Sequence, residues 1–195
     1  MSSQTPDIPN LAEILSRLQD ESLPPVHLWN PDFCGDIDMR LARDGTWFYM
    51  GTPIGRKRMV RLFSTVLRLD GDGKYYLVTP VEKIGITVDD APFVAVEANT
   101  FGEGEDQTIV FRTNVDDEVI AGPDNPIRVE IDPVTLEPSP YVMVRDGLEA
   151  LIARSVFYQL VDLGVERQED GHTVLGLWSG GHFFTVGKTE DPKDA

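Results

Sequence analysis

The chain has a single cysteine, Cys34, among its 195 residues, which excludes an internal disulfide. A chain without disulfides is typical of a reducing compartment. No apolar run approaches the roughly 20 residues that a membrane-spanning helix requires. The first ten residues, MSSQTPDIPN, lack the basic and apolar regions of a secretory signal. We therefore expect a cytoplasmic protein without a membrane partner.

Basic residues are also scarce, with 17 Lys and Arg against 33 Asp and Glu and a net charge of −16. The imbalance is local: residues 1–80 hold 9 basic and 10 acidic side chains, whereas residues 81–195 hold 8 and 23. A strongly acidic surface repels nucleic acid and anionic lipid, so neither is expected as a partner. The acidic part either keeps the protein soluble or forms a docking face.

The signatures of several enzyme classes are missing. The chain has no P-loop, no dinucleotide-binding fingerprint and no Gly-x-Ser-x-Gly elbow. The stretch that begins at Asp70, Asp-Gly-Asp-Gly, lacks the other ligands of an EF-hand and predicts only a turn. Cys34, Asp36 and Asp38 lie close together, but no histidine spacing supports a transition metal beside them. We expect neither a metal nor a cofactor.

What the chain does contain is an internal repeat. Residues 54–80 align without a gap on residues 152–178, at a shift of 98 positions. Each copy reads as an amphipathic helix, a strand, a tight Asp-Gly turn and a second strand. The matched positions include Ile54 with Ile152, Arg56 with Arg154, Leu62 with Leu160, Asp72-Gly73 with Asp170-Gly171 and Leu77 with Leu175.

The flanking patterns extend this repeat. Strands and hairpins precede each helix, and we place the helix starts at Thr52-Pro53 and at the capping-box pair Asp146 and Glu149. The sequence thus predicts an α+β fold of two related halves, each a curled antiparallel sheet packed by one helix. The predicted divisions are 1–31, a short helix at 10–18 and a Pro-rich connector; 32–122, the first half; 123–188, the second half; and 189–195, a polar tail.

Arg56 and Arg154, which occupy matching positions of the repeat, are candidates for buried cations. On a helical wheel, Arg56 and Arg154 fall within the apolar arcs of their helices, so we expect both to point towards the sheets. A buried guanidinium needs an anionic acceptor. The acceptor is either an internal carboxylate, with Asp38, Asp132 and Glu82 as candidates, or a small anionic ligand.

Our leading hypothesis is a non-enzymatic, ligand-binding or regulatory module whose site lies between the halves. Arginine can bind an anion through two parallel hydrogen bonds, and a helix N-terminus supports such binding. The residues expected at this site are Arg56, Arg154, Thr79, Glu82, Lys83 and, as an apolar wall, Trp47.

Two further hypotheses come from other side chains. Lys57, Arg58 and Arg61 form a basic cluster, which is either a solvated helix face or a contact for an acidic protein, including a second copy of the chain in a homodimer. This alternative makes the protein an interaction module that docks through the basic helix or the acidic second half. A third hypothesis is a hydrolase-like enzyme in which Asp36, Asp38 or Glu82 acts as general base.

Several short stretches also resemble the sequence motifs of a known family: Trp29-Asn-Pro31, Cys34-Gly-Asp-Ile-Asp-Met39, Arg43-Asp-Gly-Thr-Trp47, Gly51-Thr-Pro-Ile54, Arg61-Leu-Phe63 and Leu77-Val-Thr-Pro-Val-Glu-Lys83. In these stretches, and over roughly residues 29–186, the chain resembles the bacterial DUF1285 family of uncharacterised proteins. The resemblance implies a proteobacterial cytoplasmic protein, an α+β fold of two related halves, and a regulatory or signalling role. It supplies no catalytic residues.

Overall fold

The computed structural model describes residues 23–188. The helix expected at 10–18 and the tail at 189–195 lie outside the described residues. Within the described part, neither helix combines the length and the apolar character that crossing a bilayer demands.

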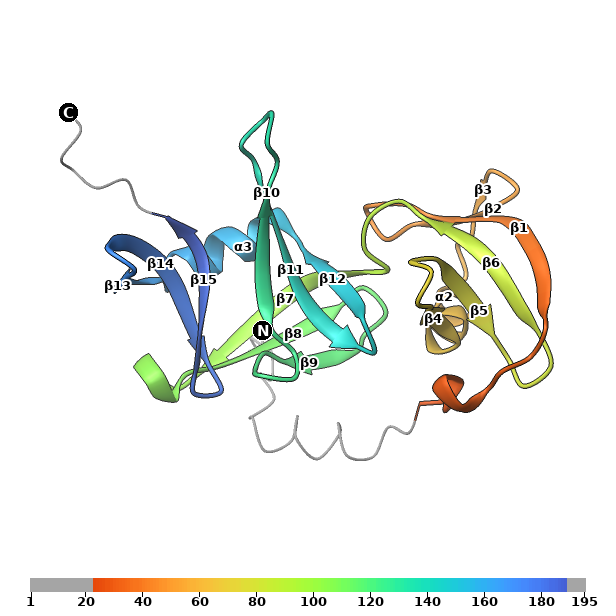
Figure 1. The fold of residues 1–195 in the computed structure, drawn as a ribbon, viewed down its shortest axis with the longest axis horizontal. Coiled ribbons are helices and arrows are strands. Elements are labelled where there is room, and N and C mark those ends of the chain that lie inside the picture. The colour runs from red at the N-terminus through yellow and green to blue at the C-terminus, as the bar shows by residue number, and fades with distance from the viewer. Residues whose placement is uncertain (1–22, 189–195) are drawn as a thin grey trace, which may run out of the picture.

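The described chain contains two α-helices, two short 3-10 helices and fifteen strands (Figure 1). In chain order they are η1 Val26–Leu28, β1 Phe33–Leu41, β2 Trp47–Tyr49, β3 Thr52–Pro53, α2 Lys57–Thr65, β4 Leu67–Leu69, β5 Tyr75–Val78, β6 Lys83–Val88, β7 Phe93–Phe101, η2 Gly104–Asp106, β8 Thr108–Thr113, β9 Glu118–Ile120, β10 Ile127–Ile131, β11 Pro138–Arg145, β12 Leu148–Ile152, α3 Arg154–Val161, β13 Val165–Glu169, β14 His172–Ser179 and β15 His182–Lys188.

The first unit, residues 33–88, is a curled six-stranded sheet in the order β3-β2-β1-β6-β5-β4, against which α2 packs. All of its pairings are antiparallel except that of β1 with β6. The helix reaches the sheet through Phe63, whose ring centroid lies 5.9 Å from that of the buried Trp47. Leu41, Leu67 and Leu77 complete this part of the core.

The second unit, residues 93–188, holds a six-stranded sheet in the order β10-β11-β12-β7-β8-β9 and a three-stranded sheet, β13-β14-β15. Its elements β10 to β15, with α3, follow the same order along the chain as β1 to β6 with α2. β15 also lies against β10, as β6 pairs with β1, although β10 and β15 belong to separate hydrogen-bonded sheets. The predicted α+β fold of two related halves is confirmed.

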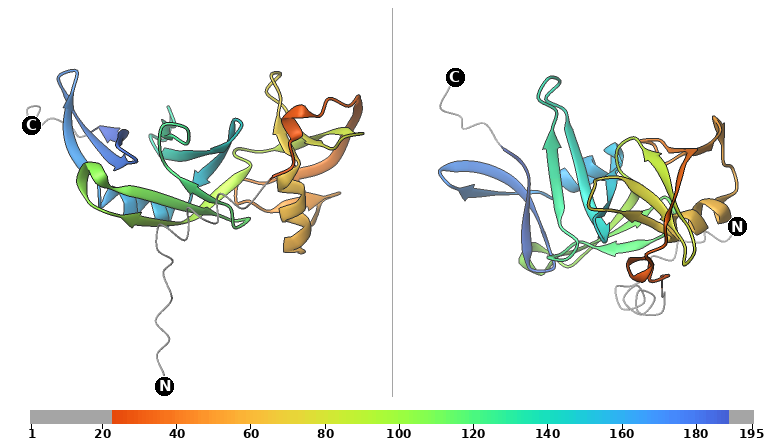
Figure 2. Two further views of the ribbon diagram at one scale, coloured as in Figure 1. Left: turned by 90° about the horizontal axis from the view of Figure 1, so that it is seen from below. Right: turned by 45° about the vertical axis from the view of Figure 1, so that its right-hand side comes forward.

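The elongated molecule has the first unit at one end and the β13-β14-β15 sheet at the other (Figures 1 and 2). The division between the units differs from the expected one at residue 122. β7 to β9 do not belong to the first unit, because β7 pairs in parallel with β12 and places Phe93 beside Ala150. Strand patterns alone predict that β7 forms, but the sheet edge that it joins depends on which apolar face it covers.

Both predicted helix starts are wrong for the same reason. Thr52-Pro53 is an edge strand, β3, and the Asp146 to Glu149 stretch enters β12. A two-residue hairpin turn with positive φ at both positions precedes each strand: Met50-Gly51 (48° and 74°) before β3 and Asp146-Gly147 (46° and 80°) before β12. Such turns match the twist of the two strands that they join. The helices therefore start only after a third strand, at Lys57 and Arg154.

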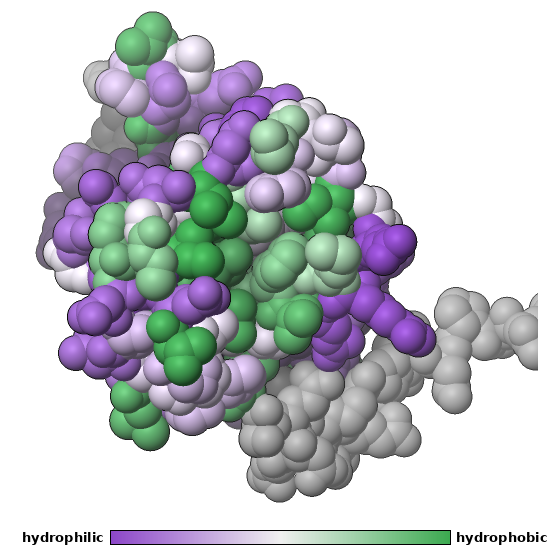
Figure 3. All heavy atoms as spheres, turned by 90° about the vertical axis from the view of Figure 1, so that its right-hand side faces the viewer, coloured by the Kyte–Doolittle hydropathy of each residue, from purple (hydrophilic) through white to green (hydrophobic). Residues whose placement is uncertain are grey.

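Large apolar side chains remain exposed on the first unit. Figure 3 shows hydrophobic residues gathered near the middle of the face that this unit turns outward. The exposed large apolar residues of the first unit are Phe33, Ile37, Tyr49, Met50, Met59, Leu62 and Val81.

Candidate functional site

The two arginines expected to face the sheets do not do so. Arg56 precedes the first turn of α2 as its N-cap and is exposed. Arg154 is the first residue of α3, and its side chain is 70% exposed. The prediction of inward arginines is wrong, because each side chain lies at the helix start, where the sheet does not cover it. Arg154 Nη2 lies 3.5 Å from Glu137 Oε1, rather than against Asp132.

The structure does not bring the other expected ligand-binding residues together with these arginines. Trp47 is 1% exposed in the core, and its indole Nε1 has no hydrogen-bond partner among the described residues. Thr79 and Glu82 close the turn between β5 and β6, where the Glu82 amide donates to Thr79 Oγ1 at 3.1 Å. The Lys83 ammonium is paired with Asp70 and lies over the ring of Tyr76.

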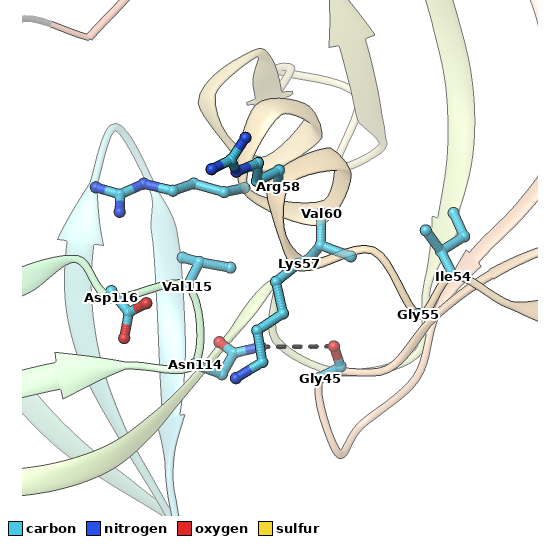
Figure 4. Close-up of a pocket in the computed structure, with 10 residues that line it drawn as sticks. Gly45, Ile54, Gly55, Lys57, Arg58, Val60, Asn114, Val115 and Asp116 are labelled. Carbon is cyan, nitrogen blue, oxygen red and sulfur yellow. Dashed lines mark hydrogen bonds between the residues drawn. The ribbon is translucent and has the colours of Figure 1, made fainter.

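The predicted basic cluster, by contrast, lines a pocket between the two units (Figure 4). This interunit pocket has a volume of about 250 Å³. One wall belongs to the first unit and the other to the turn between β8 and β9. Its lining residues are Gly45, Ile54, Gly55, Lys57, Arg58, Val60, Arg61, Asn114, Val115 and Asp116.

The first wall of the interunit pocket is positively charged. Lys57 and Arg58 form the first turn of α2, and neither has an ion pair or hydrogen bond to another side chain of residues 23–188. That turn contains no acidic residue, and no described side chain caps it. The free amides of a helix N-terminus carry partial positive charge, which adds to the charge of these cations. An anion in the pocket would meet both.

The second wall is held by Asn114. Its Oδ1 accepts a hydrogen bond from the Val94 amide at 3.0 Å, and its Nδ2 donates to the Gly45 carbonyl across the unit boundary at 3.5 Å. Asp116 also lines this wall, but its carboxylate lies 3.1 Å from Arg112 Nη1. The one acid on the pocket wall is thus already paired with a cation of its own unit.

The segment between β6 and β7 supplies another contact across the boundary. The Tyr141 hydroxyl of the second unit donates to Asp90 Oδ1 at 2.8 Å. Arg43 Nε of the first unit lies 3.2 Å from Asp90 Oδ2, an ion-pair distance without hydrogen-bond geometry. Burial of Tyr141 and its bond to Asp90 raise the pKa of the phenol to about 12.

A second hollow, the α3 pocket, lies at the equivalent place in the second unit. Ile152 and Ala153 line it, and they correspond by the 98-residue shift to Ile54 and Gly55 of the interunit pocket. Its volume is about 350 Å³. The α3 pocket is lined by Arg43, Asp132, Thr135, Glu137, Pro138, Ser139, Pro140, Leu151, Ile152, Ala153, Arg154, Phe157 and Tyr158.

Neither pocket gathers three possible metal ligands among the described residues. In residues 23–188, no three His, Cys, Asp or Glu side chains gather as metal ligands would. General acid catalysis favours a carboxyl with a raised pKa. Among the acids that line the two pockets, Asp132 has its pKa lowered instead, chiefly by hydrogen bonds from the Thr135 and Val134 amides.

Two family models match the chain. Residues 24–91 match the N-terminal domain of DUF1285, and residues 92–186 match its C-terminal domain, both described as of unknown function. The chain belongs to the DUF1285 family. The limit between the two DUF1285 models falls where the chain passes from β6 to β7, and hence from the first unit to the second.

Two crystal structures of DUF1285 family proteins are similar to this chain. One, from Silicibacter pomeroyi DSS-3 at 2.50 Å resolution, is 56% identical with a TM-score of 0.79, over 90% of this chain and 95% of that one. The other, from Shewanella baltica OS155 at 1.40 Å, is 24% identical with a TM-score of 0.51, over 64% of this chain and 90% of that one; it shows likeness of fold alone. No curated protein matches the chain.

Sequence reasoning found half of the interunit pocket. It singled out Lys57, Arg58 and Arg61 as a cluster but missed the opposite wall, residues 114–116. The available signal was the Thr-Asn-Val-Asp-Asp stretch at 113–117, whose composition predicts a turn between strands. Nothing in that stretch shows that it faces a helix more than fifty residues away.

Proposed function

We propose that the protein is a non-enzymatic regulatory module that binds a small anion carrying a phosphate or carboxylate group in the interunit pocket. The observation that carries this proposal is that Lys57, Arg58 and Arg61, in a chain of net charge −16, line one pocket at the N-terminus of α2. Since the pocket lies between the units, a ligand there contacts both and can couple its binding to their arrangement.

The physical argument rests on charge and size. Cations lining one pocket repel one another, and an anion that pairs with them relieves that repulsion. Arginine also offers parallel donors that match phosphate and carboxylate oxygens. A volume of about 250 Å³ lies just below the roughly 300–1,000 Å³ of pockets for drug-sized ligands, so a small metabolite fits better than a dinucleotide.

Isothermal titration calorimetry with inorganic phosphate, pyrophosphate and citrate tests the proposal. We expect Lys57→Ala/Arg58→Ala to weaken binding of the preferred anion at least tenfold. Arg56→Ala is the matched control, because Arg56 is an adjacent exposed cation that does not line the pocket. The proposal fails if the wild-type protein binds none of the three anions, or if Arg56→Ala weakens binding as much as the double variant.

A second candidate function is protein interaction through the same helix. Met59 and Leu62 are exposed beside the cations of α2, Leu62 to 61%. Exposed apolar side chains next to charge are typical of interfaces. The acidic second half of another copy has the charge to meet this face. Sedimentation velocity at rising protein concentration tests for this homodimer. We expect the wild-type protein to self-associate, and we expect Leu62→Asp to abolish the self-association while phosphate binding stays unchanged. A wild-type protein that stays monomeric would exclude it.

A further inference from the structure

We infer that Arg145 is a positioning residue that ties together the two walls of the interunit pocket. The inference deepens the proposed function. Its expected effect on anion binding rests on that function, whereas the role of Arg145 in holding the walls together does not. Arg145 is the last residue of β11 and belongs to the second unit. Its side chain is only 16% exposed, so its charge requires partners within the protein.

Three contacts satisfy the Arg145 guanidinium. Nη1 donates to Asp117 Oδ2 at 2.7 Å, and the Asp117 side chain is itself only 14% exposed. Nη2 donates to the Ser64 carbonyl of the first unit at 2.9 Å. The guanidinium carbon also lies 4.9 Å from the ring centroid of Phe93. One side chain thus bonds to both units.

Each of the two hydrogen-bond partners is part of a pocket wall or continuous with one. Asp117 directly follows Asp116, the last residue of the β8–β9 wall. Ser64 lies in the last turn of α2, whose first turn carries Lys57 and Arg58. At about 1.5 Å per residue, the helix is a rigid rod of roughly 10 Å between Lys57 and Ser64, so holding one end orients the other. A cation at the C-terminal end is also favoured by the helix dipole.

The turn after Arg145 shows that this part of the second unit packs on the first. Gly147 has φ of +80°, and a Cβ there would lie 3.4 Å from Leu69 Cδ2 of β4. Asp146 lines a hollow together with Leu67, Arg68 and Leu69 of the first unit. The Arg145 contact to Ser64 is therefore part of a continuous seam rather than an isolated bond.

The chemistry of the contact selects arginine. A planar guanidinium directs donors to a carboxylate and to a carbonyl at the same time, while its face stacks on an aromatic ring. A lysine ammonium is a point charge and lacks the planar face. We therefore expect Arg145→Lys to keep the charge but lose part of the coupling between the walls, and Arg145→Gln to lose more.

Distances between two spin labels test the inference. One label goes on the native, exposed Cys34 of β1, and the other on Gln159→Cys, an exposed position of α3. Pulsed electron–electron double resonance should give a narrow distribution of label-to-label distances for the otherwise wild-type protein and a broader one for Arg145→Gln. Phosphate affinity, by calorimetry, should fall at least tenfold in the same variant.

Arg128→Gln is the matched control. It removes an arginine that bonds to Glu149 within the second unit, at 2.6 Å from Nε to Oε1, and should leave both readings unchanged. If Arg145→Gln does not fold, Asp117→Asn weakens the same contact from the other side. An unchanged distribution in a folded variant overturns the inference. If the wild-type protein binds no phosphate but Arg145→Gln still broadens the distribution, the positioning role stands and the proposed function falls.

Discussion

The interunit pocket and the α3 pocket occupy the same place in the two repeat units, but they differ in whether the cations at the helix start are paired with an acid. Both lie at the start of the helix that follows the third strand, next to Ile54 in one unit and Ile152 in the other. In the interunit pocket, Lys57 and Arg58 have no paired acid among the described residues. In the α3 pocket, Arg154 lies 3.5 Å from Glu137.

The difference arises from what closes each pocket. Glu137 lies in the stretch between β10 and β11, so the second unit supplies the acid that faces its own arginine. The first unit leaves its helix start open, and the β8–β9 turn of the other unit closes it. That turn brings Asp116 already paired with Arg112. The repeated fold provides the hollow, and the neighbouring segment decides whether the cations that line it are paired with an acid.

Reversing the charge of the interunit pocket should have the largest effect. In Lys57→Glu/Arg58→Glu, two cations become acids, and we expect phosphate affinity to fall on the order of a hundredfold, or ~2.7 kcal/mol. Arg154→Glu, the same reversal in the α3 pocket, should leave this affinity unchanged. Calorimetry measures both. Equal losses in the two variants would mean that overall charge, and not the interunit pocket, governs binding.

Gly45→Ala should be next in size. Gly45 has φ of +86°, and a Cβ there would lie 2.5 Å from Asn114 Nδ2, which bonds to the Gly45 carbonyl. Left-handed backbone strain of roughly 1–2 kcal/mol and the displaced Asn114 together should destabilise the protein by about 2 kcal/mol in urea unfolding. Gly55→Ala is the control in the same pocket, because a Cβ at Gly55 would have no described atom within 4 Å. A similar loss in both variants would contradict the role of the Gly45–Asn114 contact.

Neutralising Glu137 should make the α3 pocket resemble the interunit pocket. In a Lys57→Ala/Arg58→Ala background, residual phosphate binding reports mainly on the α3 pocket. There we expect Glu137→Gln to strengthen binding by about fivefold, since an exposed ion pair is worth roughly 1 kcal/mol or less. Glu130→Gln, an acid that pairs with Arg128 outside the pocket, is the control. If calorimetry showed no gain in phosphate affinity, the pairing of Arg154 with Glu137 would not explain the difference between the two pockets.

Tyr141→Phe should have a comparably small effect, which also carries a pH signature. Tyr141 in the folded protein has its pKa raised to about 12 from 10, so between these values the folded state keeps a proton that the unfolded state loses. Its contribution is present in full below pH 10 and disappears as the pH rises to 12. We expect Tyr141→Phe to lose about 1 kcal/mol at pH 8 and to show a weaker decline in unfolding free energy above pH 10. Parallel curves for the two proteins would contradict this.

Much of the fold could be predicted from local patterns. The repeat at 98 residues, the Asp-Gly turns and the strand alternation all predicted the paired α+β units. The helix starts could not be placed in the same way, because Thr52-Pro53 fits the pattern of a helix start as well as it fits the pattern of an edge strand. The Met50-Gly51 turn decided between them by returning the chain alongside β2.

The sequence by itself determined the two-unit fold and the basic cluster of Lys57, Arg58 and Arg61, because periodicity and charge are properties of neighbouring residues. Only the tertiary structure decided what that cluster faces. The β8–β9 turn, the seam at Arg145 and the exposure of Arg56 depend on contacts between residues far apart in the chain, and no local pattern encodes those. Side-chain burial at a helix start likewise depends on where the sheet ends.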